Sequence, residues 1–401
     1  MLDLIILSLI FCLLLVLLKK KVNVGLSLII ASISLILFYT FSFEKIINSI
    51  HKTISDPNTI KLFLSLSLIR CLELVLRENN LLTKIMNDLK ELVRNKKLII
   101  ISMPLVIGML PSLGGAYFSA PMVDETTKDT NMPQEEKAFI NYWFRHVWEP
   151  ILPLYPGILL ASALSSIELR TFILYNSLVS IFMLIGGFSL SMRRLDNPKT
   201  ERQGQSNLKS QLLALFQSFL PITAILIMVI ILNIELSYAL ALSVLILFLK
   251  YNYNKEKIYG AIKYGFSKEV FVLILGIMFF KVILEDSGAV SSLSQYFNQQ
   301  GLPLFPILII IPFIIGLLTG ITVAYVGSAF PLLISLAGGI SLNQMLLAFI
   351  AGYAGVMLSP VYLCLILTRE YFKADISRFY RKISLSVALI ILPAFFYFFV
   401  L

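Results

Sequence analysis

Two apolar segments of this chain, 104–121 and 312–331, contain too many helix-breaking residues for an ordinary membrane-spanning helix. The first reads PLVIGMLPSLGGAYFSAP and the second PFIIGLLTGITVAYVGSAFP, and aligned without a gap they share Pro, Ile, Gly, Leu, Ala and Tyr at corresponding positions. Proline and glycine interrupt helices. Irregular backbone is tolerated at membrane depth only where protein buries it or where it lines a watery cavity. A duplicated segment of this kind indicates a transporter.

The remainder of the sequence is also suited to a bilayer. Hydrophobic residues make up 58% of it and charged residues 14%, and apolar runs of about 17–25 residues, the length that crosses a bilayer, recur along almost the whole chain. We therefore predict an all-α polytopic membrane protein whose partner is the lipid bilayer. The net charge of +10 does not indicate nucleic acid, because cytoplasmic loops of membrane proteins collect Lys and Arg. The three cysteines lie inside apolar runs, so we expect no metal centre.

A polar linker divides the chain into two halves that repeat the same order of elements. Each half has apolar spans, an amphipathic stretch and one broken segment, and Pro150 of the first half matches Pro360 of the second. Matching breaks are the signature of transporter repeats. The predicted divisions are 1–192 for the first repeat with its broken segment at 98–123, 193–209 for the linker, and 210–401 for the second repeat with its broken segment at 304–336. The predicted spans are 4–18, 24–41, 59–77, 137–163, 171–191, 212–232, 235–249, 270–287, 342–367 and 383–401.

The distribution of Lys and Arg predicts that the two repeats are inverted. If each broken segment is a re-entrant hairpin that enters and leaves on one side, each repeat has five transmembrane helices and the second repeat is upside down. With the N-terminus outside, the inner segments then hold 26 of the 33 Lys and Arg, as the positive-inside rule requires. If both broken segments crossed fully, the basic segments 193–209 and 250–268 would move outside. We predict ten spans and two opposed hairpins in the cytoplasmic membrane, with the N- and C-termini outside.

Small polar residues gather at the two predicted hairpin tips and at the later breaks. Helix N-termini offer N–H groups to an anion, and unwound carbonyl groups coordinate cations. We expect Ser119 and Ser328 to begin the returning half-helices. The alternative is that these small residues only permit close helix packing. The predicted substrate- or ion-binding residues are Ser112, Gly114, Gly115, Ser119, Thr319, Thr322, Ser328, Ser359 and Pro360.

Charged residues in the long span at 137–163 form a second candidate site. Asn141, Arg145 and Glu149 are spaced by four, so a continuous helix would place them on one face, with His146 beside Glu149. At about 1.5 Å per residue, Glu149 would lie about 18 Å along the helix, near mid-membrane. An intramembrane carboxylate beside a helix break indicates a proton or cation site, and Arg145 can keep it ionised or contact an anionic solute. The alternative is a structural Arg145–Glu149 pair with a satisfied histidine.

The sequence contains no motif for catalysis or nucleotide binding. A His-Glu-x-x-His pair, a Walker-type loop, a nucleophile elbow and a Cys–His cluster are all absent. We therefore predict no enzymatic activity and no cofactor other than H+ or Na+ as coupling ion. A membrane-embedded enzyme or assembly scaffold is the remaining alternative outside transport.

Two stretches of the chain resemble a known family. IGMLPSLGGAYFSAPMVDE at 107–125 and NYWFRHVWEPILPLYPG at 141–157 are similar to an uncharacterised prokaryotic integral-membrane family grouped with the ion transporter superfamily. The resemblance covers nearly the whole chain, and it implies two inverted repeats, each with a re-entrant hairpin and a discontinuous helix, in a homodimer with an elevator-like mechanism. That superfamily includes sodium-coupled dicarboxylate carriers, gluconate-type permeases, arsenite-type carriers and some sodium/proton antiporters.

The hairpin tips differ from those of the dicarboxylate carriers in that superfamily. In those carriers, Ser-Asn-Thr motifs at the tips bind sodium and the substrate carboxylate, whereas this chain has Pro-Ser-Leu-Gly-Gly at 111–115 and Thr-Gly-Ile-Thr at 319–322. Proton coupling through Glu149 is therefore a rival to sodium coupling. The expected function is secondary active transport of a small anionic, carboxylate-like solute by alternating access, coupled to H+ or Na+. The alternative within transport is cation/proton antiport at Glu149.

Overall fold

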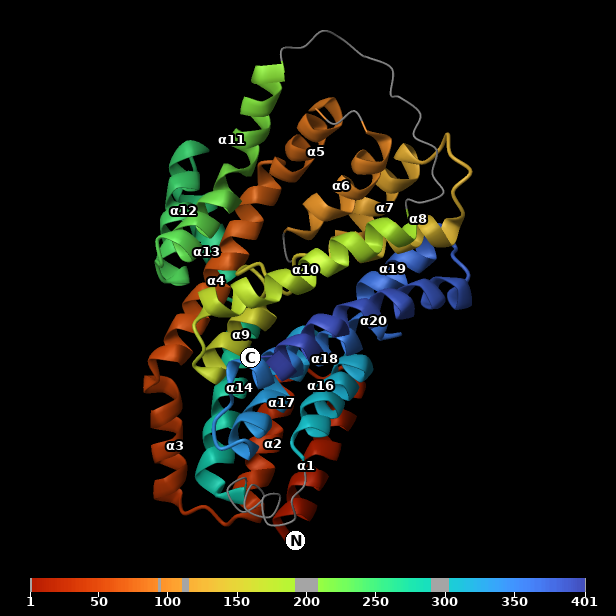
Figure 1. Ribbon diagram of the computed structural model, residues 1–401. Coiled ribbons are helices and arrows are strands. Elements are labelled where there is room, and N and C mark those ends of the chain that lie inside the picture. Colours follow the sequence, from red (N-terminus) through yellow and green to blue (C-terminus); the bar gives the residue numbers. More distant parts are fainter. Residues whose placement is uncertain (1, 93–94, 110–114, 192–207, 290–302, 401) are drawn as a thin grey trace.

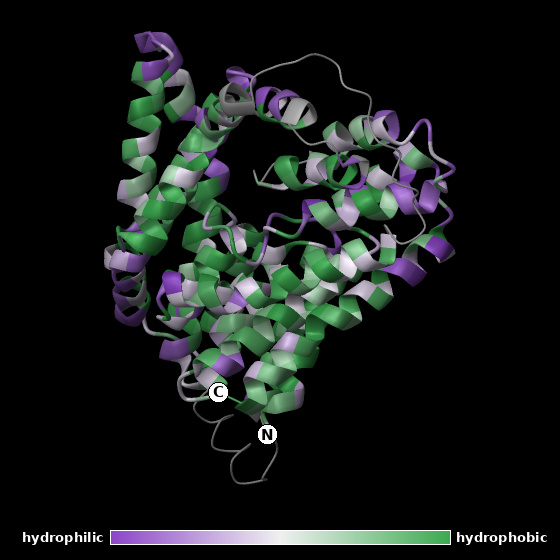
Figure 2. Ribbon diagram, turned by 45° about the horizontal axis from the view of Figure 1, so that its top comes forward, coloured by the Kyte–Doolittle hydropathy of each residue, from purple (hydrophilic) through white to green (hydrophobic). Residues whose placement is uncertain are grey.

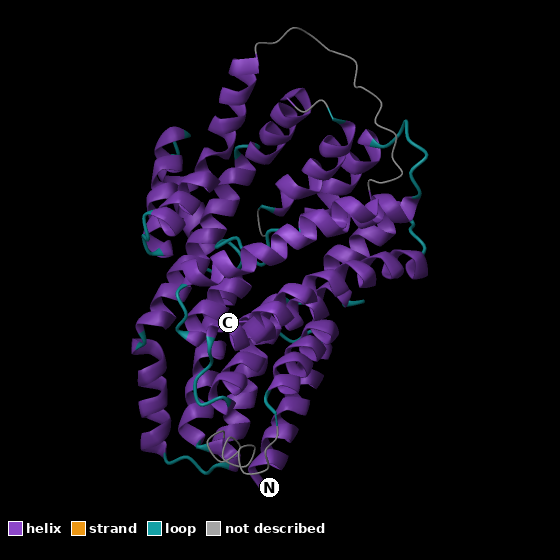
Figure 3. Ribbon diagram, in the orientation of Figure 1, coloured by secondary structure: helices purple, strands orange, loops and turns teal. Residues whose placement is uncertain are grey.

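Helices are the only regular elements in the part of the chain that the structure describes (Figure 3). The structure is a computed structural model, and it describes residues 2–92, 95–109, 115–191, 208–289 and 303–400. For these residues the all-α prediction is confirmed. The linker predicted at 193–209 lies outside the described residues except for its last two positions, which begin a helix.

Each predicted span overlaps one or two helices of the described chain, although the bounds differ by up to seven residues at the start of α20. Residues 2–191 form α1 (Leu2–Lys19), α2 (Val24–Phe38), α3 (Phe43–Ser55), α4 (Pro57–Glu78), α5 (Leu81–Leu92), α6 (Lys96–Gly108), α7 (Gly115–Thr126), α8 (Gln134–Arg145), α9 (Pro156–Ser165) and α10 (Leu169–Ser191). Residues 208–400 form α11 (Leu208–Leu226), the π-helix η1 (Ile227–Ile231), α12 (Leu236–Lys250), α13 (Lys255–Gly265), α14 (Lys268–Ser287), α16 (Phe305–Thr319), α17 (Thr322–Leu336), α18 (Leu342–Leu358), α19 (Leu363–Phe372) and α20 (Ile376–Val400).

Side-chain caps stabilise the starts of α3 and α4. The side-chain oxygen of Ser42 accepts a hydrogen bond from the N–H of Lys45 at the start of α3. Asp56 accepts one from the N–H of Asn58 at the start of α4, where Pro57 fills the first helical position. Both devices satisfy N–H groups that a helix start would otherwise leave without partners. Helix α4 therefore begins directly after Asp56, the C-cap residue of α3.

Three helical segments are long and apolar enough to cross a membrane: Leu169–Ser191, Leu342–Phe372 and Ile376–Val400. The second of them is divided at 359–362 into α18 and α19. Shorter apolar helices of 10–17 residues form α2, α9, α12, α16, α17, most of α6 and the segment Leu215–Ile231. By length and composition, the described residues are consistent with a membrane protein.

Apolar side chains cover outward faces of the helices. On α10, Leu174, Ile181 and Ile185 are exposed, whereas Asn176 and Ser180 are buried. Figure 2 shows hydrophobic residues along most of the helices and hydrophilic residues gathered at helix ends and in connections. This distribution is the reverse of that on a soluble helix, which exposes its polar face.

The helices pair across the two halves of the chain (Figure 1). Within each half, α6 packs against α8 and α16 packs against α18. Between the halves, α9 packs against α17, α19 packs against α7, and α10 packs against α20. These contacts bring the two interrupted regions, 146–155 and 359–362, close to helices of the opposite half.

The structure corrects the expected starts of the returning half-helices. We expect Ser119 and Ser328 to begin them, but α7 begins at Gly115 and α17 begins at Thr322. Ser119 and Ser328 therefore lie inside their helices, where each hydroxyl donates to a carbonyl oxygen of its own helix. The residue before α17, Ile321, supplies no side-chain cap to this helix.

Helix α5 is absent from the predicted spans. Its signal is present in the sequence, because Leu81, Ile85 and Leu89 have helical spacing. Ile85 is buried and packs in a small cluster with Ile99 and Met103 of α6. The segment is a short amphipathic helix within the basic stretch that precedes α6.

Candidate functional site

Two helical segments are interrupted at matching places, and the candidate site lies between the interruptions. The first interruption runs from the end of α8 at Arg145 to the start of α9 at Pro156, and the second separates α18 from α19 at 359–362. Pro150 and Pro360 account for them, because proline lacks the N–H that a helix needs and disfavours helical backbone in the residue before it. Each interruption exposes backbone groups at the same point of the two halves.

Glu149 is not on helix α8, contrary to the expectation of one continuous helical face. The helix ends at Arg145, and a turn follows in which the N–H of Glu149 donates to the carbonyl oxygen of His146 over 3.2 Å. Asn141 and Arg145 remain on the helix. Pro150 and the prolines after it disfavour a helix here, so Glu149 is not on the helical face of Asn141 and Arg145. The turn after α8 sets the position of its carboxylate.

The buried carboxylate of Glu149 bonds to two hydroxyl groups from the other half of the chain. Its exposed fraction is 5%. Thr322, the first residue of α17, donates its hydroxyl hydrogen bond to Oε1, and Tyr362, in the break between α18 and α19, donates to Oε2 over a longer 3.4 Å. The carboxylate thus lies at the N-terminal end of α17, where the helix dipole and the first free N–H groups favour negative charge.

Two glycines let the turn between α16 and α17 pack against both breaks. Gly320 ends α16 with a φ of +62°, a left-handed conformation that glycine adopts without strain. A Cβ atom there would lie 2.9 Å from the Cα of Tyr362 and 3.0 Å from Oγ of Ser359. A Cβ atom on Gly157, at the start of α9, would lie 2.3 Å from Cγ2 of Thr322. The turn is therefore held between the two interruptions without room for another methyl group.

Arg145 supplies a buried positive charge next to this carboxylate. Its exposed fraction is 3%, and its Nη1 donates to Sγ of Cys364, at the start of α19, over 3.4 Å. Its charge also acts on the carboxylate of Glu149. Two opposite buried charges lower the free-energy cost that either would carry alone.

Asn141 and His146 each place one unpartnered polar atom in the interior. In the part of the chain that the structure describes, Oδ1 of Asn141 and Nε2 of His146 are buried without a hydrogen-bond partner. Nδ2 of Asn141 donates to the carbonyl oxygen of Ala116 and to Oγ1 of Thr368, each over 3.0 Å. Nδ1 of His146 donates to the carbonyl oxygen of Tyr142 over 2.6 Å, which leaves Nε2 as an acceptor. Both unpartnered atoms can receive a hydrogen bond from water or a ligand.

The hydroxyl groups of three other predicted residues are bonded within their own helices. Ser119, Thr319 and Ser328 each donate to a carbonyl oxygen three or four residues earlier. The hydroxyl of Thr319 also accepts a 3.3 Å bond from the N–H of Ile321, and so helps to shape the turn before α17. Of these residues, the structure brings Thr319 to the tip that meets the Glu149 carboxylate.

The remaining predicted residues lie at or near the breaks. Ser359 is buried beside Gly320, whereas Pro360, the next residue, is exposed. Gly115 is the first residue of α7. The predicted binding residues Ser112 and Gly114 lie outside the described residues.

Sequence reasoning missed Tyr362 and Cys364. Both lie within four residues after Pro360, and Tyr362 contacts Glu149 while Cys364 contacts Arg145. The sequence indicates them only by their position shortly after Pro360, the proline that matches Pro150 of the first half. Cys364 also shows that a cysteine in an apolar run is not always a plain core residue.

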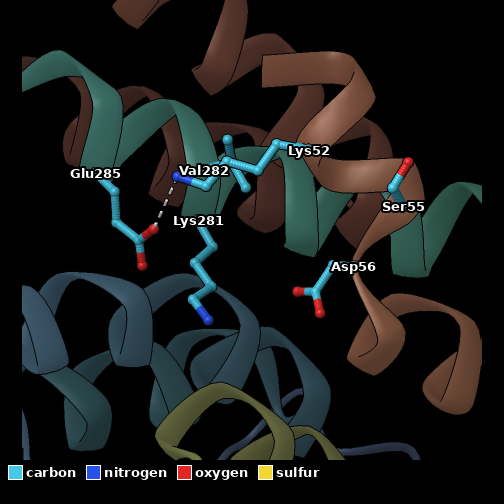
Figure 4. A pocket seen from close by; sticks show the side chains of 6 residues that line it. All are labelled: Lys52, Ser55, Asp56, Lys281, Val282 and Glu285. Atoms are coloured by element: carbon cyan, nitrogen blue, oxygen red, sulfur yellow. Dashed lines mark ion pairs between the residues drawn. The ribbon is translucent and has the colours of Figure 1, made fainter. Parts of the chain in front are cut away.

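A separate cavity of about 370 Å³ lies between α3, the start of α4 and α14 (Figure 4). Lys52 of α3 forms an ion pair with Asp286, at 3.2 Å, and with Glu285, at 3.9 Å. Lys281 of α14 and Asp56 extend into the same space (Figure 4). Positive and negative side chains line this cavity in equal number, so their charges offset each other.

Comparison with known proteins gives a family without an assigned activity. Residues 3–400 match the model of a family described as "Protein of unknown function (DUF401)". No curated protein matches the chain. The match extends over almost the whole chain, and the residues of the site fall within it.

Proposed function

We propose that this chain, which belongs to the DUF401 family of proteins of unknown function, is a proton-coupled secondary transporter of a small anionic, carboxylate-like solute. The observation on which the proposal rests is the buried carboxylate of Glu149, held at a helix break by hydroxyl groups of Thr322 and Tyr362 from the other half of the chain. A carboxyl group that joins two halves changes its partners when the halves move, and its affinity for a proton changes with them.

The surface of the molecule supports a place in the cytoplasmic membrane. Three long apolar segments and the exposed Leu and Ile side chains of α10 and α12 suit contact with lipid tails. The bias of Lys and Arg supports ten spans and two hairpins, with both termini outside. In this arrangement the protein is a carrier and not an enzyme. The same proposal includes the homodimer that the resemblance to the ion transporter superfamily implies.

The helix pairings support two inverted repeats at 1–192 and 210–401. In each half, the first helix of the broken segment packs on the helix that is interrupted next: α6 on α8, and α16 on α18. The second helix packs on the far part of the interrupted helix of the other half: α7 on α19, and α17 on α9. Such reciprocal contacts are expected of two related halves, and a movement of one helix group against the other would give alternating access.

Glu149 and Arg145 supply the chemistry of coupling. When Glu149 is ionised, Arg145 and the N-terminus of α17 offset its charge. When Glu149 takes up a proton, both groups become available to the carboxylate of a solute. Proton and anion would then cross the membrane together, which is symport.

A cation/proton antiporter is the second candidate. The observation that favours it is the asymmetry of the site, because Ser359 occupies the position in the second half that matches Glu149. A single carboxylate can hold either a proton or a cation, and exchange of the two on opposite sides of the membrane is antiport.

Proton movement in proteoliposomes tests the proposed function. Purified protein is reconstituted with a pH-sensitive dye inside the vesicles, and small mono-, di- and tricarboxylates are added outside one at a time. We expect at least one carboxylate to acidify the interior faster than it acidifies protein-free vesicles, into which monocarboxylic acids also pass slowly as the neutral acid. A change of internal pH on addition of Na+ or K+ alone would favour antiport. If no carboxylate changes the internal pH through the protein, anion symport is contradicted.

Cysteine labelling tests the topology separately. Asn48 of α3 and Glu256 of α13 are both exposed, and the ten-span arrangement places them on opposite sides of the membrane. Each new cysteine is introduced into the Cys12→Ala variant. The other two native cysteines can remain because they are buried. A membrane-impermeant maleimide should label Asn48→Cys in intact cells and Glu256→Cys only after lysis. Labelling of Glu256→Cys in intact cells would rule out this arrangement.

A further inference from the structure

Each half of the chain contains one amphipathic helix that packs on a helix of the other half. Helix α3 packs on α14, and α13 packs on α4 (Figure 1). Each of them buries two small residues four positions apart, Ser49 and Thr53 on α3 and Ala261 and Gly265 on α13. Large apolar side chains are exposed on both: Phe43, Ile47, Ile50 and Ile54 on α3, and Tyr259, Ile262 and Phe266 on and directly after α13. An apolar outward face of this kind suits a helix that lies in a membrane interface.

Close packing on α4 fixes the orientation of α13. The guanidinium carbon of Arg70 lies 4.7 Å from the centroid of the Tyr264 ring. The thiol of Cys71 donates to the carbonyl oxygen of Ala261 over 3.1 Å. A Cβ atom on Gly265 would lie 2.2 Å from Sγ of Cys71, so the two helices have no room to rotate against each other. The contact with α4 therefore determines which face of α13 remains exposed.

Tyr259, Ile262 and Phe266 form one stripe along this exposed face, because residues three and four positions apart lie side by side on a helix. Their exposed fractions are 68%, 45% and 38%. Lys255 precedes Tyr259 by one turn, Lys263 follows it by one turn, and both lysines are exposed. Lysine stems can lie along apolar surface while their charged ends reach polar headgroups. The stripe and its lysines thus suit a lipid interface.

Charge distinguishes α13 from α3. Residues 250–269 hold five lysines and two carboxylates, whereas residues 43–56 hold two of each. On α3, Lys52 forms an ion pair with Asp286. Three exposed lysines of the α13 segment are in no ion pair within the described part of the chain: Lys255, Lys263 and Lys268. The positive charge of this segment is therefore available to an anionic partner.

The two carboxylates of the segment do not offset its lysines. Oε2 of Glu269 lies 4.0 Å from Nη1 of Arg70 on α4, so a cation outside the segment shares its charge. Glu256 lies in the first turn of α13, where the helix dipole favours negative charge. The segment retains an excess of three positive charges. In the ten-span arrangement this segment is on the cytoplasmic side, where basic segments next to a membrane span attract anionic headgroups.

We propose that α13 lies in the cytoplasmic interface of the membrane and binds anionic phospholipids. The stripe of Tyr259, Ile262 and Phe266 contacts acyl chains, and the exposed lysines beside it contact the negatively charged headgroups. The neutral helix α3 contacts lipid at the opposite surface without a preference for charge. This surface is separate from the Glu149 site, and the inference goes beyond the proposed transport function.

Quenching by spin-labelled lipids measures which lipid contacts the stripe. Ile262→Cys is prepared in the Cys12→Ala chain, labelled with a nitrobenzoxadiazole fluorophore and reconstituted into phosphatidylcholine vesicles. Part of the lipid is then replaced by phosphatidylcholine or by phosphatidylglycerol that carries a nitroxide on an acyl chain. Tyr259→Cys serves as a second position on the stripe. Ile50→Cys, on the exposed apolar face of α3, is the matched control.

We expect spin-labelled phosphatidylglycerol to quench the label at Ile262→Cys more than spin-labelled phosphatidylcholine at the same mole fraction. If one lysine contacts each headgroup, the preference for the anionic lipid should be about 5-fold. The added changes Lys255→Gln, Lys263→Gln and Lys268→Gln should remove most of this preference, and high salt should weaken it. At Ile50→Cys the two lipids should quench equally.

Equal quenching by the two lipids at both stripe positions would overturn the proposal, and so would a preference that persists in the triple lysine variant. If neither lipid quenches the label at Ile262→Cys or Tyr259→Cys while both quench it at Ile50→Cys, the stripe faces protein instead. A dimer cross-linked through Ile262→Cys would then identify a second copy of the chain as its partner. None of these measurements depends on transport, so a failed carboxylate screen would leave the lipid surface standing.

Discussion

Replacing Glu149 with glutamine is expected to reduce solute-driven proton uptake to the level of protein-free vesicles and to remove its dependence on pH. The amide has nearly the same shape, and its oxygen can still accept the hydrogen bond from Thr322. It cannot bind or release a proton in the range where a carboxyl group does. The measurement is dye-reported proton uptake over a range of external pH, with the carboxylate that the screen identifies.

The change at Glu149 also leaves the buried charge of Arg145 less well compensated, so stability has to be measured with transport. Removing one partner from a buried pair costs about 3–5 kcal/mol, and the thermal midpoint of the detergent-solubilised variant shows whether it remains folded. Glu256→Gln, at an exposed carboxylate of α13, is the matched control and should transport like the unaltered protein. A folded Glu149→Gln protein with unaltered pH dependence would remove Glu149 as the proton site.

Replacing Gly108 with alanine is expected to destabilise the junction between α6 and the end of α8. A Cβ atom on Gly108 would lie 2.0 Å from the carbonyl oxygen of Arg145, and the hydroxyl of Tyr155 donates to the carbonyl oxygen of Gly108 over 2.6 Å. The added methyl group has to displace backbone that carries Arg145. Overpacking of this kind costs about 1–3 kcal/mol or more, so the thermal midpoint should fall and transport should fall with it.

Gly260 provides the matched control for this substitution. A Cβ atom there meets nothing within 4 Å, and the residue lies inside α13. Alanine favours a helix over glycine by up to about 1 kcal/mol, so Gly260→Ala should leave the midpoint unchanged or raise it. Equal midpoints for Gly108→Ala and the unaltered protein would show that the two helices do not pack as closely as described.

Features that depend on neighbouring residues could be predicted from the sequence. The apolar run at 171–191 predicts α10 to within two residues of its start, and the run at 270–287 does the same for α14. The matching prolines, Pro150 and Pro360, predict both interruptions, because proline acts on its own N–H and on the residue before it. Local chemistry therefore determined where helices occur and where they break.

The contacts of the candidate site depend on residues that are far apart in the sequence. Thr322 and Tyr362 follow Glu149 by 173 and 213 residues, and no spacing pattern connects them. The starts of α7 and α17 were mispredicted for the same reason. Close packing of Gly157 against Thr322 and of Gly320 against Tyr362 fixes the tip of the second broken segment, and only the folded arrangement contains that information.

The central claim is that Glu149 binds the proton while the groups around it bind the solute. Solute exchange tests this most directly, because exchange of labelled for unlabelled solute across the vesicle membrane needs no net release of a proton. Glu149→Gln vesicles are loaded with the unlabelled carboxylate and diluted into the labelled one, and net uptake is measured on the same preparation. The account predicts that exchange persists while net proton-driven uptake is lost. Loss of both activities in a folded variant, or retention of both, would contradict it.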